Sequence, residues 1–299
     1  MADEQISIEE KTMYYQRLTK PYNKNGMRFI DDYMDGSGKE LIEKFWSIIS
    51  SSRLAFDLYS WIVEEENIIC EMYFEKKLPG VILNHRESLG VPNMDVFIKT
   101  KSDIIFIESK YTERATKAYI NGKKPHLSKA YWDTDKYGKM EIADRFYGRS
   151  DIATMFSDFV NEINKDINNC KCPRWFYPKQ ETTHLFGIIF YLLNGRKENG
   201  KYICDQEYSG KIKDVNFYNI FWKMGGDGFK DRVGLPFVFT EKAKIMVQKI
   251  FKDSLNFNYG IKTIQNILEE SDFHGLNFKD AKTFGLPCSL KEQMKQYEL

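Results

Sequence analysis

The spacing of apolar residues along the chain switches between a helical period and short continuous runs. Helical spacing indicates amphipathic helices, and short apolar runs bounded by turn signals indicate strands. The helical spacing predicts helices over residues 27–33, 38–61, 151–168 and 241–252. The short runs predict strands within residues 71–111 and over 186–193, 214–222 and 236–240. This order of helix, strands, helix and strand predicts an α/β fold, with a mixed β-sheet core flanked by helices.

No internal repeat divides the chain, and its segments differ mainly in composition. We expect an irregular N-terminal arm over residues 1–25 and a single elaborated domain over residues 26–299. Within that domain the core covers about residues 33–194, and residues 195–299 form a C-terminal α/β extension. Residues 112–150 form a basic, aromatic insertion. Such a mixture suits phosphate contacts and base stacking, and it equally suits an ordinary solvated surface.

Composition and charge narrow the class of protein only a little. Lys and Arg number 44 and Asp and Glu 43, and the resulting net charge of +1 neither demands nor excludes a nucleic-acid partner. The N-terminus is polar and no apolar run approaches the ~20 residues of a membrane span, so we expect neither a signal peptide nor membrane association. Five dispersed cysteines favour a reducing, cytoplasmic location. Cys170 and Cys172, taken with Cys204 or His184, lack the paired Cys-x-x-Cys spacing of a strong zinc site.

The most informative chemistry lies in two strand-like runs joined by a tight turn, residues 92–98 and 104–110. If the turn is two residues long, Asp95 falls directly opposite Glu108, with Cβ atoms roughly 4.5–5.5 Å apart. Two carboxylates that close repel each other unless a cation lies between them. Because side chains alternate between the faces of a strand, Glu108 and Lys110 share one face. The hairpin therefore directs two acids and one amine toward one point.

These residue types fit a hydrolytic magnesium site. Mg²⁺ is usually held by one or two carboxylates, with water and substrate phosphate as further ligands. Such an ion polarises a phosphoryl oxygen and lowers the pKa of bound water. A lysine beside it can orient or deprotonate the attacking water. The pattern therefore predicts metal-dependent phosphoryl chemistry, with Mg²⁺ as the cofactor and Mn²⁺ as its substitute.

The pattern Pro-x-x-Asp followed by Glu-x-Lys resembles the motif of the PD-(D/E)xK nuclease superfamily, which includes restriction endonucleases, recombination exonucleases and junction resolvases. The matching residues are Pro92, Asp95, Glu108 and Lys110, with the proline three residues before the aspartate instead of beside it. Residues 50–52 (Ser-Ser-Ser) and 110–113 (Lys-Tyr-Thr-Glu) extend the resemblance to a group of bacterial restriction-endonuclease-like proteins, over roughly residues 33–194. The resemblance implies a restriction-endonuclease-like fold.

The resemblance also implies roles for the residues of the hairpin. Asp95, Glu108 and the backbone carbonyl of Ser109 would hold the metal ion, and Lys110 would position or deprotonate the water. The implied activity is hydrolysis of phosphodiester bonds in nucleic acid, with duplex DNA as the substrate of a restriction or defence endonuclease. Cleavage of both strands often uses a two-fold dimer with one site per strand, so we keep a homodimer as an expectation.

Residues on both sides of the hairpin are candidates to complete the site. The resemblance implies a further acid on the preceding helix, and Glu40 is favoured over Glu43, with Glu75 as a third candidate. The alternative for each is an ordinary solvated glutamate. Gln180 and His184 share a helix face and resemble a glutamine-containing motif whose glutamine orients the lysine, a water or a phosphate. For His184 the alternative is a half-buried structural histidine.

Two other classes of function stay open at this point. A nucleic-acid-binding protein that kept a nuclease-like fold without cutting would show no stabilisation by divalent ions. An unrelated α/β scaffold would hold Asp95 and Glu108 far apart in space.

Overall fold

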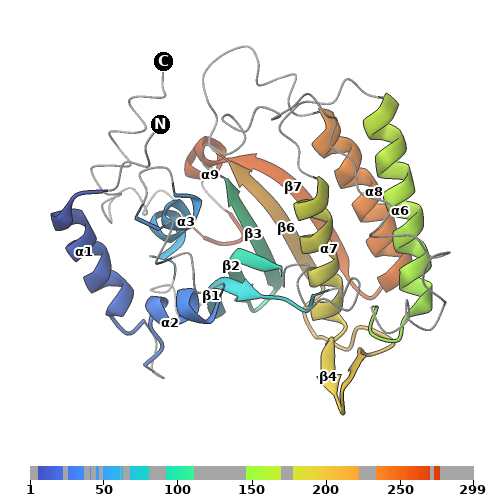
Figure 1. The fold of residues 1–299 in the computed structure, drawn as a ribbon, viewed down its shortest axis with the longest axis horizontal. Coiled ribbons are helices and arrows are strands. Elements are labelled where there is room, and N and C mark those ends of the chain that lie inside the picture. Colours follow the sequence, from blue (N-terminus) through green and yellow to red (C-terminus); the bar gives the residue numbers. More distant parts are fainter. Residues whose placement is uncertain are drawn as a thin grey trace.

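Five strands form the central sheet in a computed structural model of the chain (Figure 1). In hydrogen-bonded order they are β1 (Ile69–Lys77), β2 (Asn93–Thr100), β3 (Asp103–Lys110), β6 (Asp214–Phe221) and β7 (Asn256–Thr263). β1, β2 and β3 pair antiparallel, whereas β3, β6 and β7 pair parallel.

The structure describes residues 6–22, 26–36, 41, 45–46, 50–60, 62, 68–80, 92–110, 146–169, 178–221, 234–269 and 273–276.

Helices cover both faces of this sheet (Figure 1). One face carries α1 (Ile8–Thr19), α2 (Phe29–Asp35) and α3 (Ser51–Tyr59), and the other carries α6 (Ser150–Asn169), α7 (Pro178–Leu192) and α8 (Gly234–Phe251). A short α9 (Ile264–Glu269) follows β7, and β4 (Arg196–Glu198) and β5 (Lys201–Ile203) form a separate hairpin. The expected mixed α/β sheet flanked by helices is therefore confirmed. Within the described segments, no helix has the length and apolar character needed to cross a bilayer.

The two helical layers bury separate hydrophobic cores because strand side chains alternate between faces. Val96 and Ile98 of β2 pack with α1–α3, while Phe97 between them packs with α6–α8. β3 alternates in the same way, with Ile105 and Ile107 on the first side.

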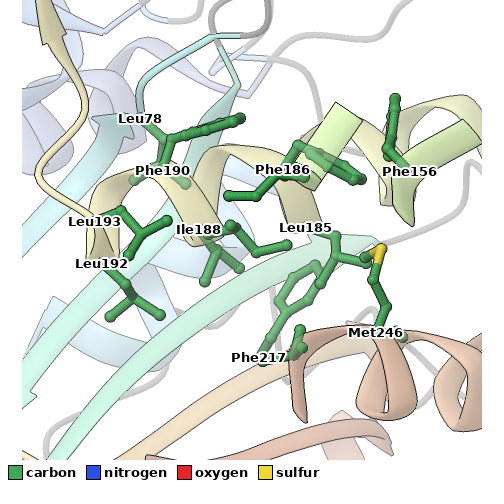
Figure 2. Close-up of a cluster of buried hydrophobic side chains, with 14 of the residues drawn as sticks. Leu78, Phe156, Leu185, Phe186, Ile188, Phe190, Leu192, Leu193, Phe217 and Met246 are labelled. Carbon is green, nitrogen blue, oxygen red and sulfur yellow. The ribbon is translucent and has the colours of Figure 1, made fainter. Parts of the chain in front are cut away.

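α7 corrects the strand expected over residues 186–193. The run is one helix, which begins at Pro178 and is buried along its apolar second half. Figure 2 shows its leucine and phenylalanine side chains among Leu78, Phe156 of α6, Phe217 of β6 and Met246 of α8. A helix buried all round has no polar stripe, so its sequence looks like that of a buried strand. Gly187 permits this close packing, since a Cβ there would lie 2.5 Å from Pro92 Cγ.

The C-terminal part departs from expectation in two further places. Residues 236–240, expected as a strand, belong to α8, in which a proline at the third position is tolerated because early helical N–H groups have no intrahelical partner. β7 was not expected, because its Asn256, Asn258 and Gly260 interrupt the apolar pattern. The expected strand over residues 214–222 is confirmed by β6.

The N-terminal arm expected over residues 1–25 is wrong, because α1 is an integral helix. Ser7 caps it, and Glu10 returns a bond to the Ser7 backbone, which makes a complete capping box. Tyr14 is fully buried, and its hydroxyl donates to Asp57 of α3 at 2.5 Å. Arg17 donates to the other oxygen of Asp57 at 3.1 Å. The helix is therefore fixed to α3 by a buried polar contact as well as by apolar packing.

The remaining expectations meet the structure in part. α6 confirms the helix over residues 151–168, and β4 pairs with β5 as an antiparallel hairpin. Of the helix expected over 38–61, α3 covers Ser51–Tyr59, and residues 37–40, 42–44 and 47–49 lie outside the described residues. Residues 111–145 of the basic insertion, Cys170 and Cys172 also lie outside them. Phe146 and Tyr147, near the end of this insertion, are buried against α7, so their rings are not available for base stacking.

Candidate active site

Three carboxylates occupy one row across neighbouring strands. In β2 and β3 the pairs run from Lys99 opposite Ile104 to Val96 opposite Ile107, which confirms the two-residue turn and brings Asp95 level with Glu108. In β1, Glu75 lies between the residues that pair with Val96 and Met94, and it is therefore level with Asp95. Glu75, Asp95 and Glu108 thus occupy neighbouring backbone positions on β1, β2 and β3, near the carboxyl end of β3.

Asp95 occupies a position that a backbone group would otherwise fill. The paired register of β2 and β3 ends at Val96 and Ile107. Beyond it, the Ser109 N–H donates to Asp95 Oδ2 at 2.5 Å instead of to a β2 carbonyl. Asp95 is 8% exposed, so this bond fixes a nearly buried carboxylate between the two strands.

Glu75 has an unusual backbone conformation. Its φ is +50°, a left-handed value that side-chain-bearing residues rarely adopt. Gly36, at the end of α2, packs directly on it, and a Cβ at Gly36 would lie 2.5 Å from Glu75 Cβ. Ser52 Oγ of α3 donates to Glu75 Oε1 at 3.4 Å, and Ser50 caps the same helix by accepting from the Arg53 N–H. The Ser-Ser-Ser element therefore starts α3 and contacts the carboxylate row.

Two buried tyrosines face this row from the α1–α3 side. Burial, followed by the charges of Glu75 and Asp95, holds the pKa of Tyr33 well above its ordinary value. Burial and the charge of Asp95 raise the pKa of Tyr59 in the same way. Both phenols therefore stay protonated, and Tyr33 donates its hydroxyl to the Ser52 carbonyl at 2.9 Å.

Glu108 meets α7 on the opposite side of the sheet. It is 1% exposed, and its Oε2 lies 3.5 Å from Nδ1 of the buried His184. α7 runs back along β3, since His184 lies by Glu108 and Tyr191 by Phe106. The first turns of α7 consequently lie over the carboxyl ends of the parallel strands, where ligands commonly bind in open α/β sheets.

A second buried polar group adjoins Glu108. Asn219 of β6 is the register partner of Glu108. Its Nδ2 donates to Glu181 Oε2 of α7 and to the Tyr259 hydroxyl of β7, both at 2.6 Å. Tyr259 donates to Glu181 Oε2 at 3.0 Å. We call Glu181, Asn219 and Tyr259 the α7 anchor.

The other residues expected at the site are only partly located. Lys110 is the last residue of β3. Gln180 lies in the first turn of α7, one turn before His184. The side chains of Lys110 and Gln180 are not among those that the structure describes. Glu40 and Glu43 also lie outside the described residues, so their roles stay predictions. Among the described residues, Glu75 is thus the acid that joins Asp95 and Glu108 in the row.

The donor atoms are suitable for a hard cation. Asp95, Glu108 and the Ser109 carbonyl offer oxygen ligands only, which is the set that Mg²⁺ prefers. Within the part of the chain that is described, no group of three or more His, Cys, Asp and Glu side chains is gathered as a metal site. Since Mg²⁺ sites often take only one or two carboxylates from the protein, the residues present fit such an ion.

The α7 anchor was not foreseen from the sequence. Asn219 shares the parity of buried Phe217 in an otherwise apolar strand, and a polar residue on a buried face is a sign of a hydrogen-bonded core group. No comparable sign marks Tyr259, which alternates in an ordinary strand pattern.

Comparison with family models, with curated proteins and with solved structures found no match to this chain.

Proposed function

We propose that this protein is a magnesium-dependent hydrolase of nucleic-acid phosphodiester bonds, a DNA endonuclease of restriction or defence type with a restriction-endonuclease-like fold. One observation carries the proposal: Glu75, Asp95 and Glu108 lie in one row on three adjacent strands, next to the strand end that carries Lys110. Buried carboxylates that lie side by side are costly unless hydrogen bonds or a cation compensate them. The sheet of antiparallel and parallel strands between helices is compatible with the proposed fold.

Each residue has a role in this proposal. Asp95, Glu108 and the Ser109 carbonyl hold the ion, and the Ser109 N–H keeps Asp95 oriented toward that end of the strands. Bound there, Mg²⁺ would supply polarisation of the phosphoryl oxygen and a more acidic water. Lys110 orients or deprotonates the attacking water, Gln180 orients the site, and Glu40 or Glu75 supplies a further acid. Duplex DNA is the proposed substrate, and a cytoplasmic homodimer is the proposed working form.

The alternative is a nucleic-acid-binding protein that does not cut. One observation favours it: Asp95 already accepts a hydrogen bond from the Ser109 N–H in the folded chain. Such a bond can satisfy a carboxylate without an ion.

Cleavage assays separate the two functions. Purified protein is incubated with supercoiled plasmid, single-stranded DNA and RNA, each with Mg²⁺ and with chelator. We expect plasmid cleavage that requires Mg²⁺ and is lost in Asp95→Asn, which is nearly isosteric. The matched control is Asp31→Asn, which changes an exposed aspartate of α2 and should cut like wild type. DNA binding without cleavage, unchanged in Asp95→Asn, would support the non-cutting protein.

A further inference from the structure

The α7 anchor connects three elements, α7, β6 and β7, through three mutual hydrogen bonds. Asn219 Nδ2 donates to Glu181 Oε2 and to the Tyr259 hydroxyl, and Tyr259 donates back to the same carboxylate oxygen. All three side chains are at least 95% buried. Because buried polar groups are costly when a partner is lost, this set specifies one position of α7 relative to β6 and β7.

The anchor lies next to the proposed metal ligand. Asn219 is directly level with Glu108 on the adjacent parallel strand. Glu181 and His184 are three residues apart on α7, so they project from neighbouring turns of one helix. His184 Nδ1 lies 3.5 Å from Glu108 Oε2. Any shift of α7 along the sheet would therefore move His184 relative to Glu108.

We infer that Glu181, Asn219 and Tyr259 are positioning residues, which fix α7 so that His184 stays directly beside the Glu108 carboxylate. The catalytic consequence rests on the proposed function. Groups that orient a metal ligand without touching the metal commonly change metal affinity or activity about 10–100-fold when they are removed. Gln180, in the first turn of the same helix, would be positioned by the same anchor.

Tyr259→Phe is the most selective change, because it removes one hydroxyl and leaves the ring stacked on Phe217, where the centroids are 4.8 Å apart. Tyr14→Phe is the matched control. It also removes a buried tyrosine hydroxyl that donates to a carboxylate, but in the α1–α3 layer. Glu181→Gln, which keeps the side-chain shape, is the second variant in case Tyr259→Phe folds poorly.

The first readout does not depend on catalysis. The chain has four histidines, so the imidazole signals of His184 can be assigned in NMR spectra with the variant His184→Gln. At one fixed pH we expect these signals to move in Tyr259→Phe and Glu181→Gln and to stay in place in Tyr14→Phe. Unmoved signals in both anchor variants would overturn the inference.

The second readout is steady-state cleavage at saturating Mg²⁺. We expect kcat to fall about 10–100-fold in Tyr259→Phe while KM for DNA stays unchanged, and we expect Tyr14→Phe to cut like wild type at temperatures where both variants are folded. Equal losses in the two variants would reduce the anchor to a general stability element and overturn the inference. If wild type does not cut but the His184 signals move as expected, the proposed function fails and the positioning of His184 stands.

Discussion

At the scale of single residues, the candidate site meets side chains from both helical layers, α1–α3 and α6–α8. Asp95 acts electrostatically on Tyr33 and Tyr59 in the α1–α3 layer, whereas Glu108 lies against His184 of α7. The register of β2 against β3 could be predicted, because a two-residue turn fixes the register of a hairpin. The Asp95 bond to Ser109 and the left-handed Glu75 could not, since the first forms beyond the last register pair of the hairpin and the second lies against the distant Gly36.

Lys110→Ala tests catalysis separately from binding. The change removes the amine next to the proposed ligands but leaves both carboxylates. Cleavage should fall roughly 10²–10⁴-fold, as for loss of a general acid–base group, while DNA binding weakens only modestly because one phosphate contact among several is lost. Metal affinity, measured by calorimetry, should persist or rise slightly, since a like charge is removed.

The matched control is Lys101→Ala, which removes an exposed lysine from the turn between β2 and β3. It should bind and cut like wild type. If Lys110→Ala also cuts at the wild-type rate, the Glu-x-Lys element is not the active site.

Asp32 gives a pH dependence of stability with a definite sign. Burial raises its pKa to about 7, although the Phe74 N–H and the Tyr22 hydroxyl donate to it. An unfolded aspartate has a pKa of about 3.9. Between this pH and about pH 7 the folded protein holds a proton on Asp32 that the unfolded chain has lost. This proton contributes to stability at low pH, and the contribution is lost as pH rises through 7. Asp32→Asn has no such proton. Its stability relative to wild type, from urea denaturation, should therefore improve from pH 5 to about pH 7 and level off above that pH.

Asp31→Asn is the control for this series. Asp31 is exposed, and the Arg28 guanidinium lowers its pKa, so it is ionised in both states over this range. Its stability relative to wild type should be flat from pH 5 to pH 8. An equally flat series for Asp32→Asn would show that Asp32 is charged in the folded protein at pH 5.

At the scale of elements, apolar runs of strand length that belong to helices were the hardest to predict. α7 and α8 contain apolar runs of strand length, and only packing against α6 and the sheet decides that they are helical. α1 was different, because its signal was present: Ser7 and Glu10 form the Ser-x-x-Glu pattern of a capping box. α6 was predicted correctly, since one face of it is apolar and the other polar.

Adjacent tyrosines of α1 test whether the N-terminal segment is part of the core. Tyr14 is 0% exposed and its ring lies edge-on to Phe45, whereas Tyr15 is 55% exposed. Tyr14→Ala should cost about 3–5 kcal/mol of unfolding free energy, as for other large buried aromatics. Tyr15→Ala should stay within about 0.5 kcal/mol of wild type. If both changes lower the unfolding free energy by small and equal amounts in denaturant titrations, residues 1–25 are an irregular arm and not part of the core.

At the scale of the whole molecule, one sheet lies between the two helical layers (Figure 1). Each layer contacts the carboxylate row, through Ser52 on one side and His184 on the other. The class of fold could be predicted, because it follows from the order of elements. The parallel pairing of β3, β6 and β7 could not, since it joins strands far apart in the sequence. That pairing brings Asn219 and Tyr259 close to Glu108 and α7.

The central claim is that Asp95 and Glu108 share a divalent ion. The most direct measurement is anomalous diffraction from crystals of the protein soaked in Mn²⁺. We predict one anomalous peak with a carboxylate oxygen of each residue about 2.1 Å away, and no peak in crystals of Asp95→Asn. Soaked wild-type crystals with no ion between the two carboxylates would contradict the account.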